Sequence, residues 1–519
     1  MNTTGRTVWA VLAMLVLMVA GHLRAAAQST ARPNIVVILS DDHAYQAISA
    51  YGSRLTQTPH IDRIAREGAL FNKAYVTNSI CGPSRATILS GRYSHKNGFK
   101  DNVQSDFNFN QHIFVKDLQQ AGYQTAWIGK MHLGDSTPQG FDYYNLLPGQ
   151  GHYYNPDFIG VGKVRKQYHG YVTNIITDLS EQWLNGRDKD KPFCLVIGHK
   201  ATHRVWMPDL PDLGLFENKT FPLPANFYDN YATRKAAMVQ DMSIDKTMLM
   251  DYDLKMYDSV AVADRQAAVK RMDAVQKKTV LDHYKKIYDD LKARKLSGKE
   301  LVEWKYQRYL RDYLATAASL DRNIGRVLDY LDQHDLTKNT IVIYLSDQGF
   351  YMGEHGWFDK RFMYEESFRT PMVMRYPGVI KPGSKVNDFV MNLDIAPTLL
   401  DAAKANKPAD LQGLSFLPLF NKGHHATRDA LYYHYYENGE HAVSPHFGIK
   451  TKRYKLIRFY KRVESWELFD LEKDPHELNN IYPTPKGKEV AAGLKKQLAA
   501  LIDQYEDTEA KVIFEQSIE

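Results

Sequence analysis

One of the chain's two cysteines stands at the start of a predicted helix, in the stretch NSICGPSRATILSGRYSHKNG, which covers residues 78–98. Pro83 is favoured in a first helical turn, so this helix is predicted to begin near Cys81 and to run to Gly91. The N-terminus of a helix offers unpaired N–H groups to an anion. Arg85 follows Cys81 by about one turn, so its guanidinium can reach the same anion.

The thiol of Cys81 has three possible fates: it is unused, it is bridged to Cys194, or it does not stay a thiol. Cys194 lies in KPFCLVIGH, an apolar run with strand character, where a free cysteine packs as a small hydrophobic residue. A disulfide between the two cysteines is therefore not expected.

Four apolar runs are each followed by polar residues that could act in catalysis or bind a metal. The runs are RPNIVVILSDDH, YQTAWIGKMHLG, KPFCLVIGHKATH and NTIVIYLSDQGF. Continuous Val, Ile and Leu bounded by turn residues predict strands buried on both faces. The polar residues at their ends are Asp41, Asp42, Lys130, His132, His199, Lys200, His203, Asp347 and Gln348.

Helical periodicity lies between these strands, for example in IDRIAREGALF and HIFVKDLQQAGY. Alternation of strands and helices predicts an α/β fold around a large, mixed but mainly parallel sheet sandwiched by helices. In such sheets a ligand binds beyond the carboxyl ends of the strands, which is where all four polar clusters are expected.

The 519 residues predict one large domain and a smaller one. Residues 1–27 have the charge, apolar stretch and Ala-x-Ala site of a signal peptide. A catalytic domain is expected over 28–424 with a helical insertion at about 240–312. A small C-terminal α+β subdomain, with an antiparallel sheet and a terminal helix, is expected over 425–519.

The net charge of +6 is too small to predict nucleic-acid binding. The apolar stretch near the N-terminus is short for a membrane span, so no transmembrane segment is expected after signal cleavage. The signal peptide predicts export to the periplasm or the extracellular space.

The pattern Cys-x-Pro-Ser-Arg, followed by ATILSGRYSHKNG, resembles the signature of the type I sulfatases of the alkaline phosphatase superfamily. The blocks NIVVILSDDH, GKMHLG, SDQGFYMGEHG and DKRFMYEESFRTPMVMRYPG resemble that family in the family's order. The resemblance implies an alkaline phosphatase-like fold. It also implies that a separate maturation enzyme oxidises Cys81 to Cα-formylglycine (3-oxoalanine), whose hydrated form supplies the oxygen that attacks sulfur.

Sulfate esters resist attack because their oxygens repel a nucleophile, so the site must neutralise that charge. A hard divalent cation does this and prefers oxygen ligands. By resemblance Asp41, Asp42, Asp347, Gln348 and the modified residue at Cys81 would hold Ca²⁺.

The resemblance assigns further roles. Arg85 would hold the formylglycine hydroxyl and the cation's surroundings in place, while Lys130 and Lys360 would bind sulfate oxygens. His132 would assist the diol. His203 would protonate the leaving oxygen, with His199 as its rival for that role.

A narrower resemblance concerns the substrate. FDYYNLLPGQGHYYNPDF, HKATHRVWMPDL and HAVSPHFGIKTKRYKLIRFY are similar to bacterial N-acetylglucosamine-6-sulfatases. This implies an exo-acting enzyme that removes 6-O-sulfate from N-acetylglucosamine or glucosamine of glycosaminoglycan or mucin glycans. The expected contacts to this sulfated saccharide are Asp359, Arg361, His441 and His446.

Three alternatives stay open at this point. The first is a sulfatase for other carbohydrates or aryl esters. The second is a phosphonate or phosphoester hydrolase of the same superfamily. The third is a glycan-binding protein without catalysis.

Overall fold

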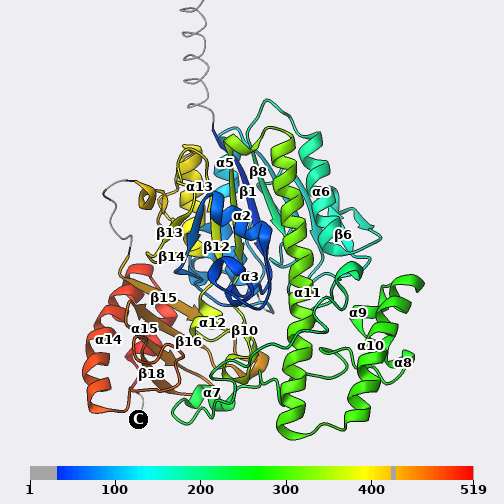
Figure 1. The fold of residues 1–519 in the computed structure, drawn as a ribbon. Coiled ribbons are helices and arrows are strands. Elements are labelled where there is room, and N and C mark those ends of the chain that lie inside the picture. The colour runs from blue at the N-terminus through cyan, green and yellow to red at the C-terminus, as the bar shows by residue number, and fades with distance from the viewer. Residues whose placement is uncertain (1–31, 104, 422, 424–427, 518–519) are drawn as a thin grey trace, which may run out of the picture.

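The computed structural model describes residues 32–103, 105–421, 423 and 428–517. The expected signal peptide lies outside these residues. A ten-stranded sheet forms the centre of the molecule (Figure 1). Its strands, in spatial order, are β13 (Ser384–Val386), β2 (Ala69–Phe71), β12 (Met372–Arg375), β9 (Thr340–Ser346), β1 (Asn34–Ser40), β8 (Phe193–Gly198), β4 (Gln124–Lys130), β5 (Tyr143–Leu147), β6 (Asp157–Gly160) and β7 (Arg165–Gln167).

The four strands predicted from the apolar runs are neighbours in the order β9-β1-β8-β4, and all three pairings are parallel. Ser40 pairs with Ser346, and Leu39 pairs with Gly198. The chain therefore leaves these strands at one edge of the sheet. The outer strands β12, β6 and β7 pair in antiparallel fashion, so the expected mixed and mainly parallel sheet is confirmed.

Helices cover both faces of this sheet. Alternate residues of β1 face two different cores: Val36 and Ile38 lie in one, and Ile35 and Val37 in the other. The first core is closed by α2 (Pro59–Glu67), α6 (Val172–Gly186) and α11 (Gly298–Gln333). The second is closed by α3 (Cys81–Ser90), α5 (Phe114–Gln120) and α13 (Ile395–Ala403).

The predicted helical insertion at 240–312 has a different form in the structure. Two helices, α10 (Ala274–Arg294) and α11, form a hairpin at one side of the molecule (Figure 1). Helix α11 continues without a break to Gln333, so a boundary at 312 is wrong because it would cut one helix in two. Residues 240–273 contain only the short helices α8 (Val260–Ala263) and α9 (Ala267–Lys270).

The C-terminal region contains the expected antiparallel sheet, made of β15 (Ala430–Tyr435), β16 (His446–Thr451), β17 (Tyr454–Phe459) and β18 (Ser465–Asp470). Helices α14 (Pro485–Tyr505) and α15 (Thr508–Glu515) follow. This sheet shares a hydrophobic core with Trp357, Phe362 and Phe368 of the large domain, so the two parts pack as neighbours. The expected boundary near 425 falls outside the described residues.

The remaining elements are short. Two further sheets pair β10 (Tyr351–Met352) with β11 (Phe358–Asp359) and β14 (Val390–Met391) with β3 (Ala74–Tyr75). The other helices are α4 (Ser94–Asn97), α7 (Lys235–Val239) and α12 (Glu365–Phe368). Over the described residues no helix is both long and apolar enough to span a bilayer.

Two glycines allow β4 and β8 to approach closely where their polar residues follow. Gly129 has φ +99°, and a Cβ there would lie 2.1 Å from the carbonyl oxygen of Gly198. A Cβ on Gly198 would lie 2.1 Å from the carbonyl oxygen of Lys130. Both contacts are far inside van der Waals distance, so side chains cannot be added here without moving the strand ends.

We predict that Gly129→Ala lowers the free energy of unfolding by about 3 kcal/mol, because it adds both backbone strain and a clash. Chemical unfolding followed by circular dichroism measures this change. Gly186→Ala is the matched control, since nothing lies within 4 Å of a Cβ there. Equal stability of the two variants would contradict the close strand approach.

Candidate active site and metal centre

Three carboxylates meet where β1 and β9 end. Asp41 and Asp42 follow β1, and Asp347 follows β9; one oxygen of each lies within 4.8 Å of the others. All three residues are fully buried. The backbone N–H of Asp42 donates to Oδ1 of Asp347 over 3.1 Å, which fixes the two strand ends against each other.

Two oxygens in this cluster have no hydrogen-bond partner among the described residues. They are Oδ1 of Asp41 and Oε1 of Gln348. The amide nitrogen of Gln348 donates to Asp42, which leaves the amide oxygen available. Buried oxygens without donors are the groups that a hard cation such as Ca²⁺ or Mg²⁺ satisfies, so this donor set fits a divalent metal.

The pKa values of these carboxylates reflect their burial and the charges close to them. Burial raises the pKa of Asp42 to about 6. Burial, followed by the charge of Asp41, raises the pKa of Asp347 to about 7. Burial opposes ionisation of Asp41 as well, but Lys130, His203 and Arg85 hold its pKa well below the usual range. A bound cation would stabilise the ionised forms of all three.

Cys81 lies beside this cluster as the first residue of α3, and the predicted end at Gly91 is confirmed by a φ of +66° there. Sγ of Cys81, a carboxylate oxygen of Asp41 and a ring nitrogen of His203 lie within 4.8 Å of one another. Both cysteines are free, as expected. Burial raises the pKa of the Cys81 thiol to about 12, so as a thiol this side chain is a poor nucleophile.

Arg85 connects three strand ends. Its Nε donates to Oδ2 of Asp347 over 2.9 Å, and its Nη1 donates to the carbonyl oxygen of Lys130 over 2.7 Å. Its Nη2 donates to the carbonyl oxygen of Ser40, the last residue of β1, over 3.4 Å. The residue is fully buried. Its guanidinium therefore fixes the position of a candidate metal ligand and of the end of β4.

Two lysines flank the carboxylates. Nζ of Lys130 forms an ion pair with Asp41. Nζ of Lys360 donates to Oδ2 of Asp42 over 2.8 Å. The two lysines are far apart in the sequence, and their ammonium groups place positive charge next to the buried carboxylates.

The histidines differ in their surroundings. Nδ1 of His203 contacts the carbonyl oxygen of Arg204 at 2.7 Å, and its Nε2 lies 3.9 Å from Oδ2 of Asp42. His203 lines the cavity in front of Cys81, whereas His199 is fully buried and does not. Nδ1 of His132 is buried without a partner among the described residues. Burial lowers the pKa of all three imidazoles.

A cavity of about 280 Å³ opens in front of Cys81 and Lys360. Three of the four expected saccharide contacts, Asp359, Arg361 and His441, line it. Nε2 of His441 lies 2.7 Å from Oδ2 of Asp359, and Arg361 pairs with Glu437 at 3.0 Å. These pairs fix the orientation of the polar wall.

The fourth expected contact, His446, is wrong. It lies on β16, fully buried among Phe362, Tyr433 and Phe459. Both of its ring nitrogens are engaged by backbone groups, the N–H of Met363 and the carbonyl of Ser444. Side chains alternate between the two faces of β16, and His446 lies on the face that packs into the core. The sequence stretch alone did not show which face it would occupy.

The structure adds residues that sequence reasoning missed. Gln150 contacts Lys130 at 2.5 Å and lines the cavity, and Asn102 accepts from the N–H of Gly82 over 3.1 Å. Arg204 also lines the cavity and is held by Asp253 through two hydrogen bonds. Gln150 and Arg204 lie in stretches that the sequence analysis singled out, but no spacing rule marked them.

Comparison with known proteins gives a consistent result. The sequence model of the sulfatase family matches residues 33–405, and that of the C-terminal part of N-sulphoglucosamine sulphohydrolase matches 353–504. An N-acetylglucosamine-6-O-sulfatase from Bacteroides thetaiotaomicron is 49% identical over 502 residues, covering 93% of this chain and 88% of that protein. An arylsulfatase from Clostridium perfringens is 29% identical over 92% of this chain and 95% of its own length.

A solved structure is similar along nearly the whole chain. It is described as a complex with its substrate D-glucosamine-2-N,6-O-disulfate. It superposes with a TM-score of 0.90 at 46% identity, covering 94% of this chain and all of that one.

We predict that His441→Gln destabilises the protein more at acid pH than at alkaline pH. Asp359 raises the pKa of His441 despite the opposing effect of burial. A raised folded-state pKa gives a stabilisation that is complete below the unfolded value of about 6.5 and is lost as pH rises through the folded value. Unfolding should show a loss of about 2 kcal/mol near pH 6 that becomes smaller at alkaline pH.

The control for this prediction is His476→Gln, which changes an exposed histidine. A loss of stability in His441→Gln that is the same at both pH values would contradict the ion pair with Asp359.

Proposed function

The chain belongs to the sulfatase family, and on this basis we propose that it removes the 6-O-sulfate group from terminal N-acetylglucosamine or glucosamine residues of glycosaminoglycan or mucin glycans. As a family member it is a sulfuric ester hydrolase acting on sulfated carbohydrate. The position of the sulfate is the proposed part. It is carried by the 49% identity to an N-acetylglucosamine-6-O-sulfatase over 93% of this chain.

The proposed nucleophile comes from Cys81. Sulfatases use formylglycine, and a separate maturation enzyme would form it here by oxidising the Cys81 thiol to an aldehyde. Once hydrated, the aldehyde supplies the oxygen that attacks sulfur. The high thiol pKa and the free state of Cys81 support this assignment, since neither a thiolate nor a disulfide serves at this position.

We propose Ca²⁺ as the metal, held by Asp41, Asp42, Asp347, Gln348 and the modified residue 81. The free oxygens of Asp41 and Gln348 support this donor set. When bound, the cation would supply positive charge against the sulfate oxygens. The ligand atoms that the four strand-end residues would offer are all oxygens, which favours a hard ion.

The chain's own cations would share that task. Lys130 and Lys360 approach the carboxylates from two sides, so sulfate bound near Cys81 would lie between two ammonium groups. Arg85 would keep Asp347 and the end of β4 in place, as its two hydrogen bonds indicate. Preorganised charge of this kind stabilises the transition state without reorganisation.

Proton transfer would use His203 and His132. The contact of His203 Nδ1 with a carbonyl oxygen leaves Nε2 on the side of Asp42 and the cavity. Because Nδ1–H donates to that carbonyl oxygen, a proton on Nε2 requires the imidazolium form, which burial disfavours and the negative charge of a bound sulfate ester would favour. In that form Nε2 can give its proton to the leaving sugar oxygen. His203 is preferred over His199 because only His203 lines the cavity. His132 would accept a proton from the diol.

The sugar would contact Asp359, Arg361 and His441. The cavity of about 280 Å³ is small and supports recognition of one terminal sugar, hence exo action. The predicted signal peptide supports export to the periplasm or the extracellular space, where such glycans are met.

We predict that the matured enzyme releases sulfate from N-acetylglucosamine 6-sulfate with a kcat/KM at least about 100-fold above that for the 3-sulfate isomer, because only one position can meet residue 81. Sulfate release is measured by ion chromatography. Preference for the 3-sulfate, or for an aryl sulfate, would favour another sulfatase specificity. Faster cleavage of an aryl phosphonate would favour the phosphonate hydrolase alternative.

Metal binding has a readout that needs no catalysis. We predict that Ca²⁺ at 100 times its Kd stabilises the wild-type chain by about 2.7 kcal/mol, and that Asp347→Asn removes this gain. Thermal unfolding with Ca²⁺ or with a chelator measures it. Asp178→Asn, an exposed change on α6, is the control and should respond as wild type. A calcium response that survives in Asp347→Asn would refute the ligand assignment.

A further inference from the structure

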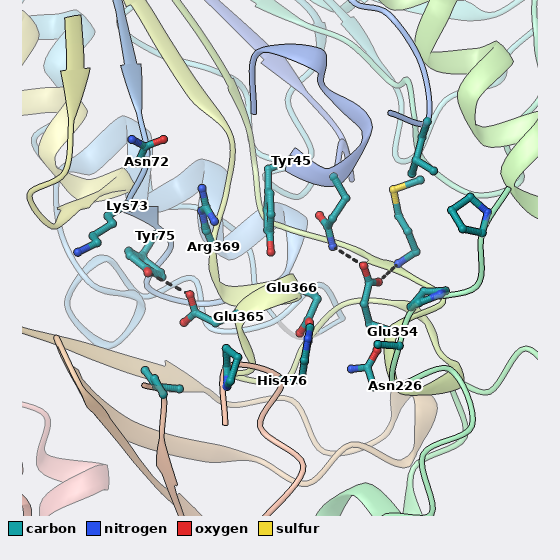
Figure 2. A pocket seen from close by; sticks show the side chains of 18 of the residues that line it. Tyr45, Asn72, Lys73, Tyr75, Asn226, Glu354, Glu365, Glu366, Arg369 and His476 are labelled. Atoms are coloured by element: carbon teal, nitrogen blue, oxygen red, sulfur yellow. Dashed lines mark hydrogen bonds between the residues drawn. The ribbon is translucent and has the colours of Figure 1, made fainter. Parts of the chain in front are cut away.

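A second and larger cavity of about 610 Å³ lies apart from the active site (Figure 2). It shares no lining residue with the cavity in front of Cys81. Tyr45 and Gln46 line it from the segment that follows the metal-site aspartates. Glu354 lines it from the segment that follows Gln348. Residues 450–452 and 471–476 of the C-terminal region close another side.

Most of the charged groups in its wall already have partners. Glu365 pairs with Lys450 at 2.8 Å and accepts from the hydroxyl of Tyr75 over 3.1 Å. Glu354 accepts from the side-chain amide of Gln46 over 3.1 Å and from the N–H of Met352 over 2.6 Å. These groups shape the wall and do not need a ligand.

Two buried polar side chains in the same wall are left without hydrogen bonds among the described residues. Asn226 is 4% exposed, and neither its Nδ2 nor its Oδ1 has a partner. Glu366 is 5% exposed and its Oε2 accepts no hydrogen bond, although it forms an ion pair with Nε2 of His355 at 3.8 Å. A buried amide with neither its donor nor its acceptor satisfied is a costly arrangement, and a ligand rich in hydroxyl groups would relieve it.

Two cations of the wall also have no carboxylate within 4.0 Å in the described part of the chain. They are Arg369, whose guanidinium stacks 4.2 Å from the ring centroid of Tyr45, and Lys73. Figure 2 shows both on the side of the cavity opposite Asn226 and Glu354. A guanidinium that is fixed by stacking and lacks a counterion suits the oxygens of a sulfate or carboxylate.

We propose that this cavity is a second, non-catalytic binding site for a sulfated saccharide. Arg369 and Lys73 bind the anionic substituent. Asn226 and Glu366 bind sugar hydroxyls, and the hydroxyl of Tyr45, which lines the same cavity, adds a further polar contact. The assignment rests on the proposed function only in the choice of a sulfated sugar as probe, since the charges and unsatisfied groups belong to this cavity alone.

A second binding site would change how the enzyme binds a polymeric glycan. A glycan carrying several sulfated sugars can be held at this cavity while a chain end enters the catalytic pocket, which raises the local substrate concentration. A single sugar gains nothing from such retention.

The test uses the full mature chain with Cys81→Ala, which removes turnover and keeps both cavities. Isothermal titration with a heparin tetrasaccharide should give two sites per chain, and the desulfated tetrasaccharide should lose the second. Arg369→Gln and Lys73→Gln should each weaken the second site at least tenfold. Arg369→Lys should recover only part of the binding, because it keeps the charge but loses the stacking on Tyr45 and the bidentate geometry. Arg462→Gln, an exposed change outside both cavities, is the matched control.

The proposal would be overturned if neither Arg369→Gln nor Lys73→Gln weakened any binding site, whether the unsubstituted cavity shows one site per chain or two. Because Lys73 is half exposed, its variant keeps the test valid even where Arg369→Gln fails to fold. Binding is measured on an inactive chain, so failure of the 6-O-sulfatase assignment and failure of the second site are read out separately.

Discussion

The structure depends on holding three buried carboxylates together at one sheet edge. Asp41, Asp42 and Asp347 would repel one another strongly in a medium of low dielectric constant. The fold opposes this repulsion with Lys130, Lys360 and Arg85, all within the same buried shell. Ser40 of β1 pairs with Ser346 of β9, so the residues that follow these two strands must lie side by side. The strand register therefore brings the three carboxylates together.

Part of the backbone strain lies around the same cluster. Asp42, His132, Asp359, Arg361 and His441 all have positive φ values, between 55° and 99°. Side chains other than glycine rarely adopt this conformation, and each instance carries a free-energy cost that the surrounding packing must offset. Asp42 belongs to the carboxylate cluster, and Asp359, Arg361 and His441 line the cavity, so in these four residues the strain fixes side chains that the site uses.

Much of this arrangement could be predicted from the sequence. The four apolar runs predict which strands are buried on both faces. Each run is followed by polar residues, and because parallel strands end at the same edge of a sheet, these residues are predicted to gather there. The helix at Cys81 followed from Pro83 and Gly91. These features are local or follow from a general rule of sheet topology.

Other features depend on contacts between distant segments, which no local pattern records. Arg85 reaches the carbonyl oxygen of Lys130, and Gln150 meets the same lysine from a loop. His446 was misplaced because a strand residue can face either side, and only the packing of β16 decides. The insertion boundary failed because the amphipathic pattern of α11 continues through it.

The central claim is that residue 81 acts as an oxidised side chain beside a buried cation site. Mass spectrometry of the peptide that contains residue 81, from protein produced together with a maturation enzyme, tests it most directly. This peptide is expected to carry an aldehyde in place of the thiol, while the peptide containing Cys194 keeps its thiol. An active preparation in which residue 81 is entirely unmodified cysteine would contradict the account.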